Sequence, residues 1–298
     1  MRNLITIRNF SVLLCASLLA SCGPSRQNRI VVGSKNFTEQ LVLGELIAQQ
    51  IENRTHLPVE RRFYLAGTYI CQQAILAGRI DIYPEYTGTA LTAILKNKPG
   101  DDRDKVYEEV KREYAKRFGL LVGSTLGFDD TFAIEIRGED ARRLGLQTIS
   151  QAAAYTPRWR AGFGYEFMER SDGYKGLVAA YGLRFAGPPR IMDLGLLDRA
   201  LQDKQVDLIA GNRTDGLVRA LDLFVLEDDR HYFPPYQAVF MVRRDALARL
   251  PPLADVVNKL GNAISTDEMR KLNYEVDGAR RDKKIVVQEW LKQKGLDR

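Results

Sequence analysis

The segment from Gly78 to Ala90, GRIDIYPEYTGTA, places two tyrosines and a glutamate where an apolar, strand-like run ends. Phenol rings present electron-rich faces, and a neighbouring carboxylate adds negative charge, so the combination suits a cation. The alternative is that both rings fill a hydrophobic core. We expect Tyr83 to pack within a sheet and Tyr86, beside the Thr-Gly-Thr turn, to contact a ligand.

Residues suited to catalysis or metal binding are sparse. The 2 histidines, His56 and His231, lie far apart, and the 3 cysteines have no metal-binding or disulfide spacing. The chain also lacks the GxSxG turn and the GxxxxGK[ST] phosphate loop. We therefore expect no metal, no cofactor and no enzymatic activity. Cys71 is expected to be a small buried apolar residue.

The composition is that of an ordinary globular protein. The chain has 298 residues, of which 45% are hydrophobic and 28% charged, with room for one large domain or two moderate ones. The formal net charge of +6 comes from 44 basic and 38 acidic side chains without a block of five like charges. A groove for nucleic acid is therefore disfavoured.

Residues 1–21 predict a lipoprotein signal peptide. Arg2 and Arg8 precede an apolar run that is shorter than the roughly 20 residues of a membrane span. The tetrapeptide LASC, ending at Cys22, resembles a bacterial lipobox and implies a lipid on Cys22, with residues 22–28 as a polar tether. Loss of the two arginines lowers the formal charge from +6 to +4. The alternative is an ordinary signal peptide followed by an unmodified cysteine.

Strand and helix patterns alternate along the rest of the chain. In the first half, strands are expected at 29–33, 59–64 and 79–86, with helices at 38–53, where Thr38 is the expected N-cap, and at 68–78. In the second half, strands are expected at 160–166, 183–187 and 206–212, with helices at 173–182 and 195–203. This alternation predicts α/β sheets.

The two halves align weakly with each other. Residues 74–88 lie on residues 200–214, which places Asp81 on Asp207 and Tyr86 on Asn212. We infer two similar lobes, each with loops at the carboxyl ends of its strands, where α/β sheets bind ligands. The helices expected in the last sixty residues would close the first lobe.

Several ordered motifs carry a family resemblance: VVGSKNFTEQLVLGELIAQQIE, GRIDIYPEYTGTAL, FMERSDGYKGL, MDLGLLDRAL, TDGL and VLEDDRHYFPPY. From about Ile30 onward the chain resembles the substrate-binding proteins of ABC importers for quaternary ammonium osmoprotectants such as glycine betaine, choline and carnitine. The resemblance implies an α/β, two-lobed periplasmic-binding-protein fold, type II-like, with two hinge crossings and a ligand cleft between the lobes. Lobe I would comprise residues 28–131 and 237–298, and lobe II residues 132–236.

The resemblance also implies how such a protein works. It would be a monomer in the periplasm or at the cell surface, attached to the membrane by its lipid alone. It would capture a quaternary ammonium or betaine-like compound and pass it to an ABC permease and its ATPase.

Three aromatic positions match the family's ligand cage. Tyr86 matches a cage tyrosine, Phe132 keeps the ring where a tyrosine is common, and Tyr236 matches a wall residue. A quaternary ammonium has no N–H to donate, so aromatic faces suit it, each contributing about 0.5–2 kcal/mol.

Three polar positions match the end of the cleft that meets a ligand carboxylate. They are Lys35, the hydroxyl of Thr89, and Arg170, which would reach across the cleft. Lys35 could instead be a solvated loop charge. Arg170 could instead form an ion pair with Asp172 or Glu166.

Two positions depart from the family pattern. Asp198 stands where relatives tend to have the tyrosine of GLMY or GLRY, and Asn212 replaces a tyrosine before the TDG motif. A carboxylate and an amide favour a ligand with more positive charge or more hydrogen-bond donors than glycine betaine. We hypothesise a larger zwitterion such as a betainised amino acid. Asp198 could instead pair with Arg199 or Arg219.

Two other functions stay open at this stage. A ligand sensor that never feeds a permease would need the same two-lobed cleft. A receptor of the same fold for amino acids or oxyanions would lack the aromatic cage, and Tyr86→Ala would then leave its binding unchanged.

Overall fold

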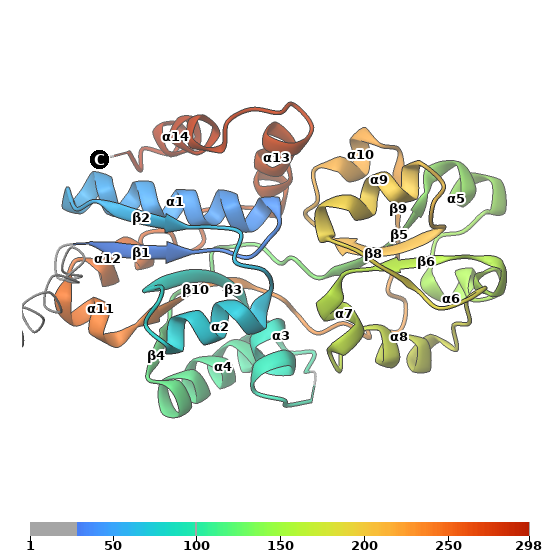
Figure 1. The fold of residues 1–298 in the computed structure, drawn as a ribbon, viewed down its shortest axis with the longest axis horizontal. Coiled ribbons are helices and arrows are strands. Elements are labelled where there is room, and N and C mark those ends of the chain that lie inside the picture. Colours follow the sequence, from blue (N-terminus) through green and yellow to red (C-terminus); the bar gives the residue numbers. More distant parts are fainter. Residues whose placement is uncertain (1–28, 99, 298) are drawn as a thin grey trace, which may run out of the picture.

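The computed structural model describes residues 29–98 and 100–297. They form two lobes side by side, each built around a five-stranded sheet (Figure 1). The expected signal peptide (1–21), the lipidated Cys22 and the tether (22–28) lie outside the described residues.

The first sheet has the order β2-β1-β3-β10-β4, in which β10 runs antiparallel to both of its neighbours. Its strands are β1 (Ile30–Gly33), β2 (Val59–Arg62), β3 (Ile82–Tyr86), β4 (Leu120–Val122) and β10 (Ala238–Arg243). The helices of this lobe are α1 (Thr38–Thr55), α2 (Thr68–Leu76), α3 (Thr87–Thr89), the π-helical turn η3 (Ala90–Ile94), α4 (Arg103–Phe118), α11 (Arg244–Arg249), α12 (Leu253–Asn258), α13 (Thr266–Asp277) and α14 (Lys283–Gln293).

The second sheet has the order β7-β6-β8-β5-β9. Its strands are β5 (Phe132–Arg137), β6 (Ala161–Phe163), β7 (Arg190–Ile191), β8 (Leu208–Asn212) and β9 (Leu223–Leu226). The helices of this lobe are α5 (Gly138–Leu144), α6 (Ile149–Ala152), η4 (Thr156–Arg158), α7 (Tyr165–Glu169), α8 (Tyr174–Tyr181), η5 (Leu194–Leu196), α9 (Leu197–Gln202) and α10 (Leu217–Ala220).

The two sheets share one topology, since β6, β7, β8, β5 and β9 occupy the places of β1, β2, β3, β10 and β4. The aspartates aligned in the sequence play the same part in both. Asp81 accepts the Val31 N–H of the adjacent strand at 2.8 Å, and Asp207 accepts the Arg160 N–H just before β6 at 2.9 Å. The weak internal repeat therefore corresponds to a repeated strand–loop junction.

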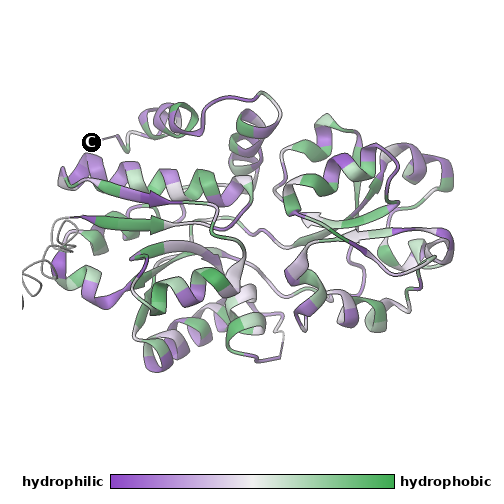
Figure 2. Cartoon of the chain, in the orientation of Figure 1, coloured by the Kyte–Doolittle hydropathy of each residue, from purple (hydrophilic) through white to green (hydrophobic). Residues whose placement is uncertain are grey.

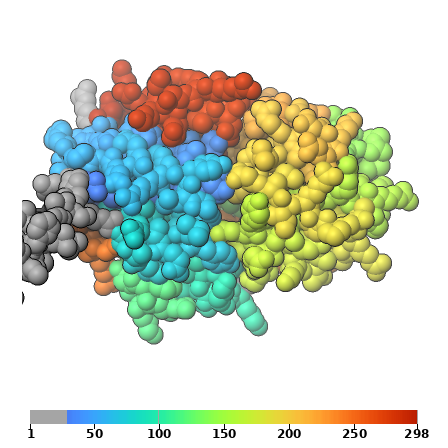
Figure 3. Space-filling model, viewed as in Figure 1, coloured from blue at the N-terminus to red at the C-terminus, as the bar shows by residue number. Residues whose placement is uncertain are grey.

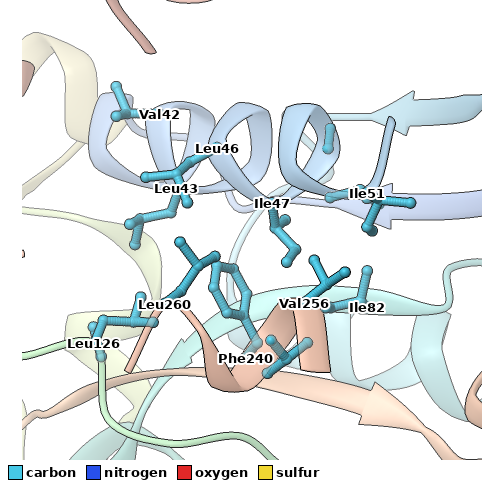
Figure 4. Close-up of a cluster of buried hydrophobic side chains, with 14 of the residues drawn as sticks. Val42, Leu43, Leu46, Ile47, Ile51, Ile82, Leu126, Phe240, Val256 and Leu260 are labelled. Carbon is cyan, nitrogen blue, oxygen red and sulfur yellow. The ribbon is translucent and has the colours of Figure 1, made fainter. Parts of the chain in front are cut away.

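The largest hydrophobic core lies between α1 and the first sheet (Figure 4). Leu43, Leu46 and Ile47 of α1 face Phe240 of β10 and Val256 of α12, all of them buried. Helices α12, α13 and α14 pack against α1, so the C-terminal helices close the first lobe. Figure 2 shows hydrophobic residues concentrated on the central strands and hydrophilic residues on the outer helix surfaces.

Two local expectations are wrong. The N-cap of α1 is Phe37, because the Thr38 hydroxyl instead donates to Asp277 of α13 at 2.6 Å. Residues 183–187 do not form a strand: the Ala186 N–H bonds the carbonyl of Trp159, outside any ladder, and β7 lies at the sheet edge instead. Phe185 of this segment still packs into the second lobe's core.

The chain crosses between the sheets twice, in residues 123–131 and 227–237. The expected lobe boundaries fall at the ends of these crossings. The two crossings pair with each other, since Asp129 bridges Gln237 and the Asp130 N–H bonds the carbonyl of Tyr236 at 3.1 Å. The lobes contact each other along their facing sides (Figure 3).

Candidate ligand-binding site

A cavity of about 370 Å³ lies between the lobes and is lined by residues of both. All the residues predicted to bind ligand line it except Asp198. They are Lys35, Tyr86, Thr89, Phe132, Arg170, Asn212 and Tyr236. We call this space the first chamber. Tyr83, by contrast, is buried in the core beside α2, where its hydroxyl donates to Gln72.

The first chamber has aromatic walls that come from separate elements. Tyr86 ends β3, Phe132 begins β5, and Tyr236 lies in the crossing before β10. Phe132 meets Tyr236 edge to face at 5.6 Å, and Phe37 stacks on Tyr86 at 6.4 Å between ring centroids. The sequence analysis did not identify Phe37, although it lies in the GSKNF segment two residues after Lys35.

Tyr86 is held by a buried acid. Its hydroxyl donates to Glu39 of α1 at 2.7 Å, and the other Glu39 oxygen accepts from the Thr214 hydroxyl and the Asn273 amide at 2.5 and 3.0 Å. Burial raises the pKa of Glu39 and also that of the Tyr86 phenol. Glu39 lies in the first turn of α1, where the helix dipole favours an acid, and it also orients a wall of the chamber.

The two basic residues of the first chamber are both paired with buried acids. Lys35 forms an ion pair with Glu85, and its Nζ lies 5.0 Å from the centroid of the Tyr86 ring. Arg170 donates twice to Asp172, at 2.8 and 2.5 Å. Burial alone would raise the pKa of Asp172, but the guanidinium of Arg170 holds it below its usual value.

Arg170 also reaches across the cleft. Its Nη1 donates to the Thr89 hydroxyl at 3.1 Å, and its guanidinium carbon lies 4.9 Å from the Phe132 centroid. The two alternatives considered for Arg170 are therefore compatible, because it pairs with Asp172 while lining the chamber. Glu166 accepts the Tyr69 N–H at 3.0 Å instead.

Asp130 is a lining residue that sequence reasoning missed. Its Oδ1 accepts from the Thr214 N–H at 3.2 Å and lies 2.7 Å from the Thr214 hydroxyl oxygen, whose single proton is donated to Glu39. Its buried Oδ2 has no partner. Burial, followed by the nearby Glu39, raises the pKa of Asp130 well above its usual value. The pair of acids Asp129 and Asp130, which precedes Thr131 and Phe132 in DDTF, was the available signal.

Asp198 lies in a second chamber of about 230 Å³. The two chambers adjoin, since Asn36, Phe37, Leu194 and Asn212 line both. The ion pair of Asp198 with Arg199 or Arg219, considered as an alternative to ligand contact, is not formed within the part of the chain that the structure describes. Burial, and then the neighbouring carboxylate of Asp215, raises the pKa of Asp198 to about 8.

Hydrogen bonds join the lobes around the chambers. Asp193 accepts from the Asn36 amide at 3.0 Å and from the Tyr64 hydroxyl at 3.2 Å, and Asp172 accepts from the Thr92 hydroxyl at 2.8 Å. The described lobes are thus in a closed arrangement.

Two classes of feature are absent from residues 29–98 and 100–297. No group of three or more His, Cys, Asp or Glu side chains there could hold a metal ion. No helix in this range has both the length and the hydropathy needed to cross a membrane.

Comparison with known proteins identifies the family of the chain. Residues 28–293 match the family model OpuAC, described as the substrate binding domain of ABC-type glycine betaine transport system. The carnitine transport binding protein OpuCC of Listeria monocytogenes serotype 1/2a is 36% identical over 293 residues, which are 95% of this chain and 94% of that protein.

A second relative is longer than this chain. The ergothioneine transport permease/ergothioneine binding protein EgtU of Helicobacter pylori is 33% identical over 288 residues, which are 96% of this chain but 51% of that protein. Among solved structures, one described as a glycine betaine/carnitine/choline ABC transporter superposes with a TM-score of 0.73 at 32% identity, covering 90% of this chain and 100% of that one.

The solved structure superposes over most of this chain, and the matched family model describes a transport substrate-binding domain, which is not an enzyme family. The match of the family model covers nearly the whole described chain. The chain therefore belongs to the family of substrate-binding domains of ABC-type glycine betaine transport systems, and it has their two-lobed α/β fold.

Proposed function

We propose that this protein is an extracytoplasmic lipoprotein that captures a quaternary ammonium or betaine-type compound in the first chamber and delivers it to an ABC permease and its ATPase. The observation that carries the proposal is the convergence of aromatic and basic side chains on one cavity between the lobes. The lipid would be on Cys22, outside the described residues.

The rings would hold the ammonium group. Four rings line the first chamber: Phe37, Tyr86, Phe132 and Tyr236. Each desolvated ring contributes about 0.5–2 kcal/mol to the free energy of binding a cation. Several such contacts are compatible with micromolar binding, about −8 kcal/mol, after the ordering of the ligand is included.

The polar side of the chamber would hold a carboxylate. Lys35, Thr89 and Arg170 line it, and each supplies N–H or O–H donors. Because Glu85 and Asp172 already balance the two basic charges, these groups would act chiefly through hydrogen-bond geometry. Ligand contact by each of these residues is a prediction.

The departures at Asp198 and Asn212 support a ligand larger and richer in donors than glycine betaine. The relative named for ergothioneine, at 33% identity, is in keeping with such a ligand. We propose a betainised amino acid as the ligand class.

Isothermal titration calorimetry of the purified protein with choline, carnitine, glycine betaine and ergothioneine tests this function. We expect at least one of these compounds to bind in the micromolar range or tighter, and Tyr86→Ala to abolish that binding. Tight binding of glycine betaine would refute the shift in ligand. Failure of all four compounds would refute the transport function as stated.

A further inference from the structure

We propose that the second chamber is a subsite for an N–H-bearing group at the far end of the same ligand. The ligand would then be an amino-acid betaine whose side chain donates hydrogen bonds, such as a methylated histidine. This inference rests on the function proposed for the first chamber.

The position of the second chamber suits one ligand spanning both spaces. Phe37 and Asn212 belong to the walls of both chambers, so a ligand whose ammonium group lies against Phe37 can extend past Asn212. Asn212 ends β8 and is paired in register with Phe132, a wall of the first chamber. The paired ends of β5 and β8 therefore contribute a wall of the first chamber and a wall that both chambers share.

The charges of the second chamber favour a donor or a cation. Glu39, Asp198, Asp215 and Asp277 line it, against one exposed base, Arg199. Three of these acids already have donors: Glu39 as described above, Asp277 from Thr38, and Asp215 from the Leu217 N–H at 2.8 Å. Within the described chain, the hydrogen-bonding neighbour of Asp198 is the carboxyl of Asp215, so Asp198 retains acceptor capacity.

A second observation independently points to a missing donor. Asn273 is 3% exposed and lines the chamber, and its Oδ1 has no partner. Its side-chain NH2 group already donates to Glu39 and to the carbonyl of Thr214, at 3.0 and 2.9 Å. A buried acceptor without a donor is unfavourable by about 1–3 kcal/mol, and a ligand N–H would remove that penalty.

One further buried acid, Glu135, lies behind the wall of the second chamber. Both oxygens of the buried Glu135 lack partners, and Glu135 lies beneath Gly211, which lines the chamber. A Cβ added to Gly211 would lie 2.5 Å from Glu135 Oε1, so the glycine allows this close approach. A ligand donor in the second chamber would therefore lie near the lining acids Asp198 and Asp215 and near Glu135 behind Gly211.

The chemistry of the group follows from these contacts. A quaternary ammonium has no N–H and cannot satisfy Asn273 or Asp198. A metal ion is disfavoured because no group of three suitable side chains exists in the described chain. An organic N–H donor, as in an imidazole or amine, meets both requirements.

Two matched compounds test the subsite. Nα-trimethylhistidine and Nα-trimethylphenylalanine share the ammonium and the carboxylate, but only the first has a ring N–H. By titration calorimetry at pH 7.5, we expect the wild type to bind the histidine compound about 10- to 100-fold more tightly, as a hydrogen bond to a charged or unsatisfied group would give.

Substitution of Asp198 tests whether the preference for the histidine compound arises in the second chamber. Asp198→Leu should reduce that preference to less than about threefold, while affinity for the phenylalanine compound is retained. Asp198→Asn, which keeps the shape and an acceptor, should give an intermediate preference. Asp267→Asn, at a highly exposed acid of α13, is the matched control and should leave both affinities unchanged.

The outcomes separate the two proposals. Equal wild-type affinity for the two compounds, or an unchanged ratio in a folded Asp198→Leu variant, overturns the subsite and leaves the transport function standing. If neither compound binds, and choline, carnitine and glycine betaine also fail, both proposals are overturned.

Discussion

The two chambers differ in how their charges are balanced. In the first, each basic residue has a buried acid of its own: Lys35 has Glu85, and Arg170 has Asp172. The second chamber is lined by four acids and by one exposed base, Arg199. The basic charges of the first chamber are therefore balanced within the protein, whereas the acids of the second chamber outnumber its base and can accept a proton or a hydrogen-bond donor.

The largest effect is expected when the first chamber loses the partner of a buried acid. Arg170→Ala leaves Asp172 buried without its partner, and removal of one member of a buried pair typically destabilises a protein by about 3–5 kcal/mol. We expect a loss of that size in the free energy of unfolding, measured by urea denaturation. Arg199→Ala, which removes the basic residue of the second chamber, is the control. Equal losses in the two variants would contradict the distinction.

The buried acids of the second chamber should make the stability of the protein depend on pH. Burial and Asp215 keep Asp198 protonated up to about pH 8 in the folded protein, whereas an unfolded aspartate titrates near 3.9. The native state then binds the extra proton, so stability falls as pH rises from 5 to 9. Asp277 strengthens this effect and Arg199 weakens it.

Asp198→Asn should remove this part of the pH dependence, about 1–3 kcal/mol across that range. Urea denaturation of both proteins at several pH values measures it. Parallel stability curves for the wild type and the variant would show that Asp198 titrates normally.

The aromatic wall can be weakened without touching either set of charges. Phe37→Leu should weaken binding of a quaternary ammonium by about 2- to 30-fold, corresponding to the contribution of one ring. Tyr155→Leu, in the Tyr155–Trp159 stack away from the chambers, is the matched control in calorimetry. An unchanged affinity in the Phe37 variant would place the ammonium elsewhere.

The smallest expected effect concerns lobe closure. Asp193→Ala removes acceptors for Asn36 and Tyr64 at the edge of both chambers. Since each bond contributes about 0.5–1.5 kcal/mol, and Tyr64 is exposed, we expect ligand release to become about 2- to 10-fold faster. Stopped-flow measurement checks this, and an unchanged release rate would show that these bonds do not hold the lobes closed.

Much of the fold was predictable because hydrophobic periodicity is local. The strand at Ile30–Gly33 and the helix over Thr38–Thr55 follow directly from their patterns. The strand expected at 183–187 was wrong because an apolar run can also fill a core from a loop, as Phe185 does.

The candidate site was predictable only in part. The family resemblance led to lining residues such as Tyr86 and Arg170, and Asp172 was named as a possible partner of Arg170. Glu85 was not identified as the partner of Lys35. Lys35 and Glu85 are 50 residues apart in the chain and meet only in the folded lobe. No periodicity in a single sequence encodes that pairing, and the same holds for the unpartnered oxygen of Asp130.

The paired crossings have a consequence for how binding could be observed. Asp130 lies in one crossing, Phe132 directly follows that crossing, and Tyr236 lies in the other, so side chains that line the first chamber sit on or beside the backbone that must rotate when the lobes separate. A bound molecule would restrain those dihedral angles directly. Amide hydrogen exchange should therefore slow at Asp130, whose N–H bonds across the crossings, more than at amides in the sheets, which are protected in either state.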